Sequence, residues 1–127
     1  MAEKDLDQIH IQDLRLNTIV GVYPEERGRK QEVVLQVRME VDLKAATESD
    51  RLEDTVDYKA VKQRIIKEVE KSDFRLIERV AGRVAELCLE TPGVHAVEVE
   101  VEKPGALRFA RTVSVKIRRR RQEGGGS

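Results

Sequence analysis

Strict alternation of apolar and polar side chains is the feature that most limits how this chain can fold. Residues 35–43, 97–102 and 112–118 each alternate one for one. Successive side chains of a β-strand point to opposite faces of its sheet, so the alternation predicts strands with one buried and one solvated face. A one-sided sheet of this kind is typical of antiparallel strands, and other elements have to cover its apolar face.

The N-terminal residues add a fourth strand. Residues 8–22 place apolar side chains at positions 9, 11, 14 and 16, so the alternation slips by one residue near Asp13. Such a slip predicts a β-bulge. The polar loop YPEERGRKQ, residues 23–31, leads from this strand to the strand at residues 32–43, and the two strands predict a hairpin.

Between the two strand pairs the apolar period changes to that of a helix. A first helix is predicted behind Asp57, with apolar-face positions at Tyr58, Val61, Ile65 and Val69. A second helix is predicted to begin near Asp73 and to end at the Thr-Pro-Gly of residues 91–93. The element order is therefore β-β-α-α-β-β. We expect an α+β fold, an antiparallel four-stranded sheet with two helices on one face.

The composition excludes several classes of protein. The 127 residues carry 24 Lys and Arg against 24 Asp and Glu, so no net charge draws the chain to nucleic acid or to an anionic membrane. The arginines at 118–121 are interpreted as a solvated strand end, because two Phe, two Tyr and no Trp offer little surface for base stacking. No apolar run reaches the ~18 residues of a membrane span and no signal-peptide stretch begins the chain, so we expect a cytoplasmic protein.

The length fits a single domain, which we place at residues 1–121. Residues 122–127 include Gly-Gly-Gly-Ser and are predicted to be a flexible, linker-like tail. Cys88, the single cysteine of the sequence, falls on the apolar side of the second helix and is interpreted as an inert core residue. His10 and His95 lack ligand spacing to each other or to Cys88, so we expect no metal site.

Four polar residues occur where the fold alone does not require them. They are Glu26 after the first strand, Tyr58 at the first helix, Glu78 within the apolar stripe of the second helix, and Lys103 in the turn before the last strand. Taken singly, each has an ordinary structural explanation. Glu26 and Lys103 fit solvated loop charges, Tyr58 fits a core aromatic with its hydroxyl at the surface, and Glu78 fits a helical ion pair.

Together, these residues lie in four motifs whose order and spacing resemble the bacterial dihydroneopterin aldolase family. The motifs are GVYPEER, TVDYKAV, RLIERVAGRVAE and VEVEKPGALRFARTVSV, and the resemblance covers residues 9–117. One such motif would be a weak signal, whereas four in register along most of the chain are specific. The resemblance implies the tunnelling fold, in which four subunits join sheet edges into a ring around a pore. It further implies a homotetramer, or a homo-octamer of two stacked rings with sites between subunits.

The resemblance also implies a reaction. The chain would be a lyase of folate biosynthesis that cleaves 7,8-dihydroneopterin by a retro-aldol step into 6-hydroxymethyl-7,8-dihydropterin and glycolaldehyde, with epimerase activity in many members. No cofactor is implied. The N5=C6 imine of the substrate itself accepts the electron pair that other aldolases pass to a Schiff base or a metal ion.

By the same resemblance, Glu78 would accept hydrogen bonds from the 2-amino group and the ring N–H of the pterin, a donor pair that suits a carboxylate. Glu26 and Lys103 would hold the trihydroxypropyl chain and move its protons through a water. Tyr58 would handle the proton at the new hydroxymethyl carbon or its hydroxyl. Further substrate contacts would come from Ile77, Val56 and Tyr58.

Two alternatives stay open. The stretch ALRFARTVSV also resembles the related dihydroneopterin triphosphate 2'-epimerases, which would use the same residues on phosphorylated or free dihydroneopterin. Pro104 after Lys103 favours the aldolase, because the epimerases have no proline at that place. The second alternative is an engineered, non-catalytic subunit that keeps only the ring assembly, which the GGGS end and the densely charged surface suggest.

Overall fold

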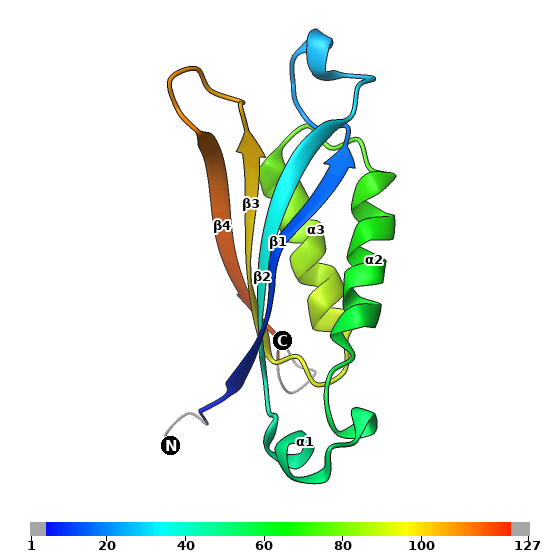
Figure 1. Ribbon diagram of the computed structural model, residues 1–127. Coiled ribbons are helices and arrows are strands. Elements are labelled where there is room, and N and C mark those ends of the chain that lie inside the picture. Colours follow the sequence, from blue (N-terminus) through cyan, green and yellow to red (C-terminus); the bar gives the residue numbers. More distant parts are fainter. Residues whose placement is uncertain (1–4, 123–127) are drawn as a thin grey trace.

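The computed structural model describes residues 5–122, so the predicted tail lies outside the described residues apart from Gln122. Within this range, four strands form one antiparallel sheet, and helices connect the two strand pairs (Figure 1). The elements are β1 (Asp7–Thr18), η1 (Pro24–Glu26), β2 (Gln31–Val41), α1 (Lys44–Ser49), η2 (Leu52–Asp54), α2 (Tyr58–Glu70), α3 (Ile77–Glu90), β3 (Ala96–Pro104) and β4 (Thr112–Arg120). The predicted fold class is confirmed.

Each strand pairs with its neighbour in the chain, so β1 and β4 are the edges of the sheet. The bulge predicted in β1 is confirmed, because the register with β2 shifts between Ile11 and Leu14 and Asp13 has a φ of 55°. Gln36 of β2 holds the bulge: its Oε1 accepts from the Asp13 N–H and its Nε2 donates to the Asp13 carboxylate. The bulge returns Leu16 to the buried face.

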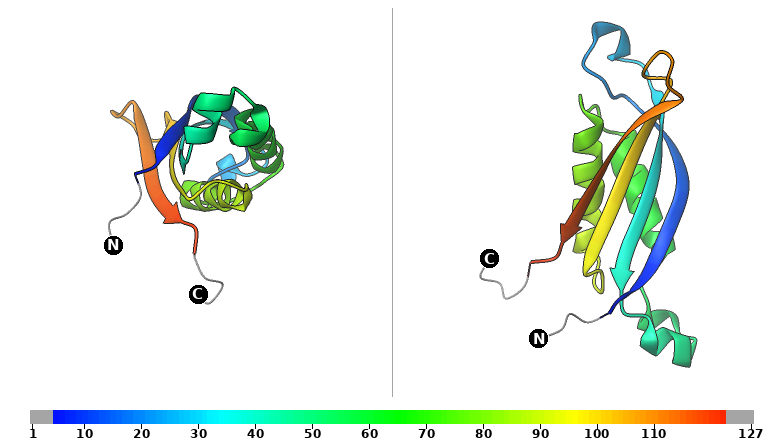
Figure 2. Two further views of the ribbon diagram at one scale, coloured as in Figure 1. Left: turned by 90° about the horizontal axis from the view of Figure 1, so that it is seen from below. Right: turned by 90° about the vertical axis from the view of Figure 1, so that its left-hand side faces the viewer.

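Helices α2 and α3 lie together on the apolar face of the sheet (Figure 2). The Asp57 side chain caps α2 by accepting from the N–H groups of Lys59 and Ala60. The core between helices and sheet is aliphatic and includes Cys88, where burial raises the thiol pKa to about 12. A thiol with such a pKa is unreactive near neutral pH, in keeping with the expected core role. No helix in the described part of the chain is long and apolar enough to cross a membrane.

Two parts of the N-terminal half differ from the sequence prediction. β1 was expected to run to residue 22 but ends at Thr18, whose hydroxyl donates to the carbonyl of Val69 at 2.7 Å and ties the strand end to α2. Beyond it, the Gly21 N–H bonds to the Phe74 carbonyl rather than to β2. Residues 44–55, for which no element was predicted, contain α1 and η2.

The second helix was expected to begin near Asp73, and this boundary is wrong. α3 begins at Ile77, because the carbonyl oxygens of Asp73 and Phe74 accept hydrogen bonds from the Arg27 guanidinium instead of from a helix. These partners are distant in sequence, so local periodicity carried no sign of them.

The face of the sheet opposite the helices carries the expected polar side chains, and these form cross-strand ion pairs. Arg38 of β2 and Lys116 of β4 contact the Glu98 carboxylate of β3 at 3.4 and 3.8 Å. Arg118 of β4 pairs with Glu40 of β2. Such exposed pairs add little stability singly, but they keep this face compatible with water.

Glu68 links the two long helices. Its carboxylate lies 2.6 Å from a guanidinium nitrogen of Arg83 in α3 and 3.0 Å from Lys71. Hydrogen bonds from Arg83 first, and then from Lys71, hold the pKa of Glu68 at about 2 against an ordinary 4.5. A carboxyl with a lower pKa in the folded protein stabilises it above the unfolded-state pKa, and that contribution disappears as the pH falls from about 4.5 towards 2.

We therefore expect Glu68→Gln to reduce the loss of stability in acid. Urea midpoints measured at pH ~7 and pH ~3 should differ less for the variant than for the wild type. Glu48→Gln is the control, because the Glu48 carboxylate of α1 makes no ion pair within residues 5–122. An acid sensitivity equal to that of the wild type would show that the Glu68 contacts do not govern this pH dependence.

Candidate active site

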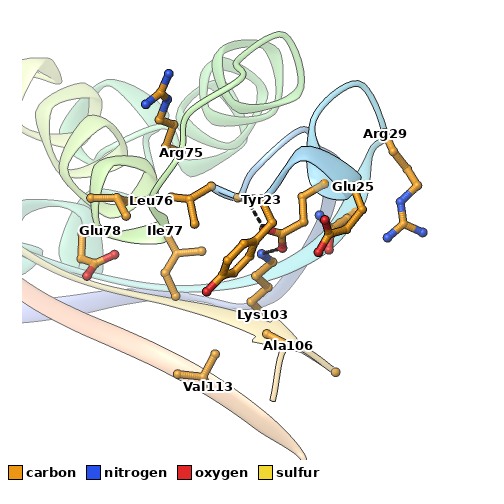
Figure 3. A pocket seen from close by; sticks show the side chains of 15 residues that line it. Tyr23, Glu25, Arg29, Arg75, Leu76, Ile77, Glu78, Lys103, Ala106 and Val113 are labelled. Atoms are coloured by element: carbon orange, nitrogen blue, oxygen red, sulfur yellow. Dashed lines mark hydrogen bonds and ion pairs between the residues drawn. The ribbon is translucent and has the colours of Figure 1, made fainter. Parts of the chain in front are cut away.

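A cavity of about 530 Å³ opens at the end of the sheet where β3 ends (Figure 3). Three segments line it: the loop of residues 21–31, residues 75–78 at the start of α3, and the end of β3 with the connection that follows it and the start of β4. Segments distant in sequence therefore meet here, and the cavity includes four of the residues singled out in the sequence, Glu26, Ile77, Glu78 and Lys103.

Lys103 lies at the inner end of the cavity, with only 11% of its side chain exposed. It was expected in a turn, but it belongs to β3, where it pairs with Val113 of β4. Val99 and Val101 precede it at two-residue spacing and face the core. Lys103 continues their inward-facing series, so the strand directs its side chain beneath the loop of residues 21–31.

Glu26 is the partner of Lys103. Its Oε2 lies 2.5 Å from Lys103 Nζ, and its Oε1 accepts from the Tyr23 N–H at 3.2 Å. The Lys103 hydrogen bond is the main cause that lowers the pKa of the Glu26 carboxyl, and partial burial opposes it. Gly21 makes room for this carboxylate, because a Cβ at that position would lie 2.2 Å from Glu26 Oε1. The Gly21 φ of 141° also disfavours any other residue.

Glu78 lies in the first turn of α3, on the other side of the cavity. In Figure 3 the side chain of Ile77 lies between Glu78 and Lys103, and Leu76 is nearby. The Glu78 side chain is exposed and makes no ion pair or hydrogen bond to any of residues 5–122. From one side to the other, the cavity thus presents an unpaired carboxylate, then an apolar wall, then a separate carboxylate–lysine pair.

Tyr58 and Val56 do not lie at this cavity. Tyr58, at the start of α2, is 60% exposed and lines a different hollow with His10 and Lys62. The start of α2 is at the end of the molecule near α1, away from the end where β3 stops (Figure 1). Val56 has its side chain in the core, which leaves its backbone as the part available to a ligand. The single chain therefore does not bring Tyr58 to Lys103.

Sequence reasoning missed other residues of the cavity. Tyr23, Leu76 and two arginines, Arg29 and Arg75, also line it. Tyr23 and Leu76 are exposed apolar side chains. For Tyr23, the available signal was a large apolar residue beside a turn with no periodic pattern that buries it, whereas Leu76 was assigned to the apolar stripe of the second helix. No group of His, Cys, Asp and Glu suited to a metal ion occurs among residues 5–122.

Comparison with known sequences shows the family of the chain. Residues 9–118 match the family described as FolB: Dihydroneopterin aldolase. The chain is 36% identical over 115 residues to a dihydroneopterin triphosphate 2'-epimerase of Pseudomonas aeruginosa, covering 91% of this chain and 94% of the relative. It is 35% identical over 114 residues to the dihydroneopterin aldolase of Escherichia coli K12, covering 90% and 93%.

Solved structures agree as well. The crystal structure of E. coli dihydroneopterin aldolase in complex with neopterin superposes with a TM-score of 0.84 at 35% identity, covering 90% of this chain and 99% of that one. The fold and these matches define an enzyme scaffold of the α+β class. The chain belongs to the dihydroneopterin aldolase family, as its four motifs predicted. The near-equal identities to an aldolase and an epimerase do not separate these two activities.

Proposed function

We propose that the chain cleaves 7,8-dihydroneopterin by a retro-aldol reaction, giving 6-hydroxymethyl-7,8-dihydropterin and glycolaldehyde in cytoplasmic folate biosynthesis. The observation that carries the proposal is one cavity with a free carboxylate, Glu78, on one side and the Glu26–Lys103 pair on the other. The free carboxylate suits the amidine-like edge of a pterin ring, and the pair suits the hydroxyl groups of its side chain. Residues 1–121 would act as one domain.

The ring is bound at the α3 side of the cavity. Glu78 accepts from the 2-amino group and a ring N–H, while Leu76 and Ile77 pack against the flat apolar face of the ring. This orientation directs the trihydroxypropyl chain towards Lys103. The neopterin bound to the E. coli relative supports a pterin as the ligand.

Cleavage requires that the hydroxyl on the second side-chain carbon lose its proton as the bond between the first and second side-chain carbons breaks. The electron pair of that bond enters the N5=C6 imine and forms an enamine, so no cofactor has to accept it. Ionised Glu26 holds Lys103 Nζ in place, and Lys103 relays the proton through a bridging water. A proton delivered to the first side-chain carbon then yields the hydroxymethyl product.

Tyr58 belongs to this site through a neighbouring subunit. β1 and β4 have no further strand partner within residues 5–122, and pairing β4 of one subunit with β1 of the next would continue the antiparallel sheet. We therefore propose a homotetrameric ring, alone or stacked as a homo-octamer, with the polar sheet face towards the pore.

A complementation experiment tests the shared site. Tyr58→Phe and Lys103→Ala subunits, each nearly inactive alone, are mixed under conditions in which subunit exchange is verified. Random mixing in a closed ring should restore up to about a quarter of the sites, because each site then draws Tyr58 and Lys103 from different chains. Mixed rings without any recovered activity would place the whole site in one chain.

The reaction itself is tested by its products. The protein is incubated with 7,8-dihydroneopterin, and glycolaldehyde and 6-hydroxymethyl-7,8-dihydropterin are measured together. Equal release of both supports the aldolase. A side-chain stereoisomer formed without glycolaldehyde would identify an epimerase, and unchanged substrate in the presence of intact rings would leave the non-catalytic assembly subunit.

One observation favours the epimerase as second candidate. Arg29 and Arg75 line the cavity, and neither makes an ion pair within residues 5–122, although most arginines of this region do. Figure 3 shows both guanidinium groups at the margin of the cavity. Unpaired arginines at this place suit a phosphorylated side chain. If Arg29→Ala weakens binding of dihydroneopterin triphosphate but not of dihydroneopterin, the phosphorylated compound is the preferred substrate.

A further inference from the structure

Arg27 connects two segments that line the cavity, although its own side chain does not line it. Its guanidinium donates to three backbone carbonyl oxygens: those of Gly21 at 2.9 Å, Asp73 at 2.7 Å and Phe74 at 3.2 Å. The Gly21 N–H adds a direct bond to the Phe74 carbonyl at 3.3 Å. A single side chain thus fastens the loop that carries Glu26 to the segment that leads into α3.

This connection matters because the start of α3 has no local cap. The residue before α3, Leu76, provides no side-chain hydrogen bond to the first turn. Helix starts without a capping side chain depend on tertiary contacts to fix where they begin. Here Arg27 engages the carbonyl oxygens of Asp73 and Phe74, Leu76 has an extended backbone, and the helix begins at Ile77 with Glu78 in its first turn.

We propose that Arg27 is a positioning residue that sets the separation between the Glu26–Lys103 pair and Glu78. The inference rests on the proposed function of the cavity, since it concerns a ligand that contacts both sides at once. Glu26 precedes Arg27 in the chain, and Glu78 follows Phe74 by one short segment. A shift of the loop against α3 would leave each side intact but misalign the reacting side chain with the bound ring.

The arrangement requires the shape of arginine and not only its charge. The planar guanidinium presents several N–H donors in fixed directions, which lets it reach carbonyls of two segments together, whereas a lysine ammonium on a flexible stem does not reproduce this geometry. The nearby ion pair is weak by comparison. Asp73 Oδ2 lies 3.8 Å from the guanidinium, and 78% of the Asp73 side chain is exposed.

The test compares Arg27→Lys and Arg27→Gln with Asp73→Asn, a matched control that removes the carboxylate but keeps the backbone acceptor. Two quantities are measured for each variant. The first is the steady-state turnover of 7,8-dihydroneopterin, and the second is the affinity for neopterin and for 6-hydroxymethylpterin, which lacks the trihydroxypropyl chain. Both Arg27 variants should lose about 10- to 100-fold in kcat, while 6-hydroxymethylpterin binding changes less than about 3-fold. The preference for neopterin over 6-hydroxymethylpterin should shrink in both. Asp73→Asn should stay within about 2-fold of the wild type.

Hydrogen exchange gives a readout that does not depend on catalysis. The amides of residues 21–26 and 74–78 should exchange faster in both Arg27 variants than in Asp73→Asn. Any one of three results would overturn the inference. They are a wild-type kcat and ligand preference in Arg27→Lys, amide exchange rates unchanged from the wild type, and an equal loss of affinity for both ligands. If the wild type releases no glycolaldehyde, the proposed reaction fails, and the exchange and ligand preferences still decide the role of Arg27.

Discussion

Lys103→Ala is expected to remove most of the turnover while leaving pterin-ring binding nearly unchanged. Lys103 Nζ lies 2.5 Å from Glu26 Oε2 at the inner end of the cavity, opposite the carboxylate assigned to the ring. A positioned group that transfers a proton in the transition state contributes about 10²- to 10⁴-fold, so kcat should fall within that range. The affinity for 6-hydroxymethylpterin, which needs Glu78 rather than Lys103, should change little.

The variant also leaves the Glu26 carboxylate without its partner, although only 18% of the Glu26 side chain is exposed. Folding of the variant therefore has to be verified by urea denaturation. Lys67→Ala removes a lysine of the last turn of α2 that does not line the cavity, and it serves as the control for loss of one positive charge. If Lys103→Ala turns over at nearly the wild-type rate, Lys103 is a structural partner of Glu26 and has no part in the chemistry.

The strand positions could be read from the sequence because each depends on local alternation. Even the bulge at Asp13 was visible, since one extra residue shifts the apolar positions that follow it. The start of α3 could not be read in this way. It is fixed by Arg27, 46 and 47 residues away from Asp73 and Phe74, and no local period records such a contact.

The candidate site was predicted in part as a set of residues, but not as a geometry. Motif spacing singled out Glu26, Glu78 and Lys103, which the fold brings to one cavity. The Glu26–Lys103 bond joins residues 77 apart, so only the folded chain reveals it. Local information did contain the burial of Lys103, because it continues the inward series of Val99 and Val101, but a lysine next to a Pro-Gly turn favoured the loop interpretation.

The separation of Tyr58 from this cavity has a simple physical origin. Tyr58 begins α2, whereas the cavity lies beyond the opposite end of that helix, and 13 helical residues span about 20 Å at 1.5 Å per residue. A rigid helix cannot be shortened to bring the hydroxyl to Lys103. A role for Tyr58 at this cavity therefore rests on the proposed neighbouring subunit.

Glu78→Ala is expected to weaken the binding of every pterin, with or without a side chain. The carboxylate is free of ion pairs in the described part of the chain and borders an apolar wall formed by Leu76 and Ile77. A bound ring would cover it and leave two ring donors facing it. Removing the acceptor leaves those donors without a partner. This costs about 2–4 kcal/mol of binding free energy, or roughly 30- to several-hundred-fold in Kd.

Titration with neopterin and with 6-hydroxymethylpterin measures this loss, and the two ligands should lose affinity by similar factors, since both present the same ring edge. This equal loss separates Glu78 from Lys103 and Arg27, whose variants should discriminate between the ligands. Glu86→Ala is the control, because Glu86 lies on the same helix and pairs with Arg83 at 3.1 Å rather than lining the cavity. Unchanged affinity for both ligands in a folded Glu78→Ala protein would mean that the ring is held elsewhere, and the orientation that directs the side chain to Lys103 would then have no anchor.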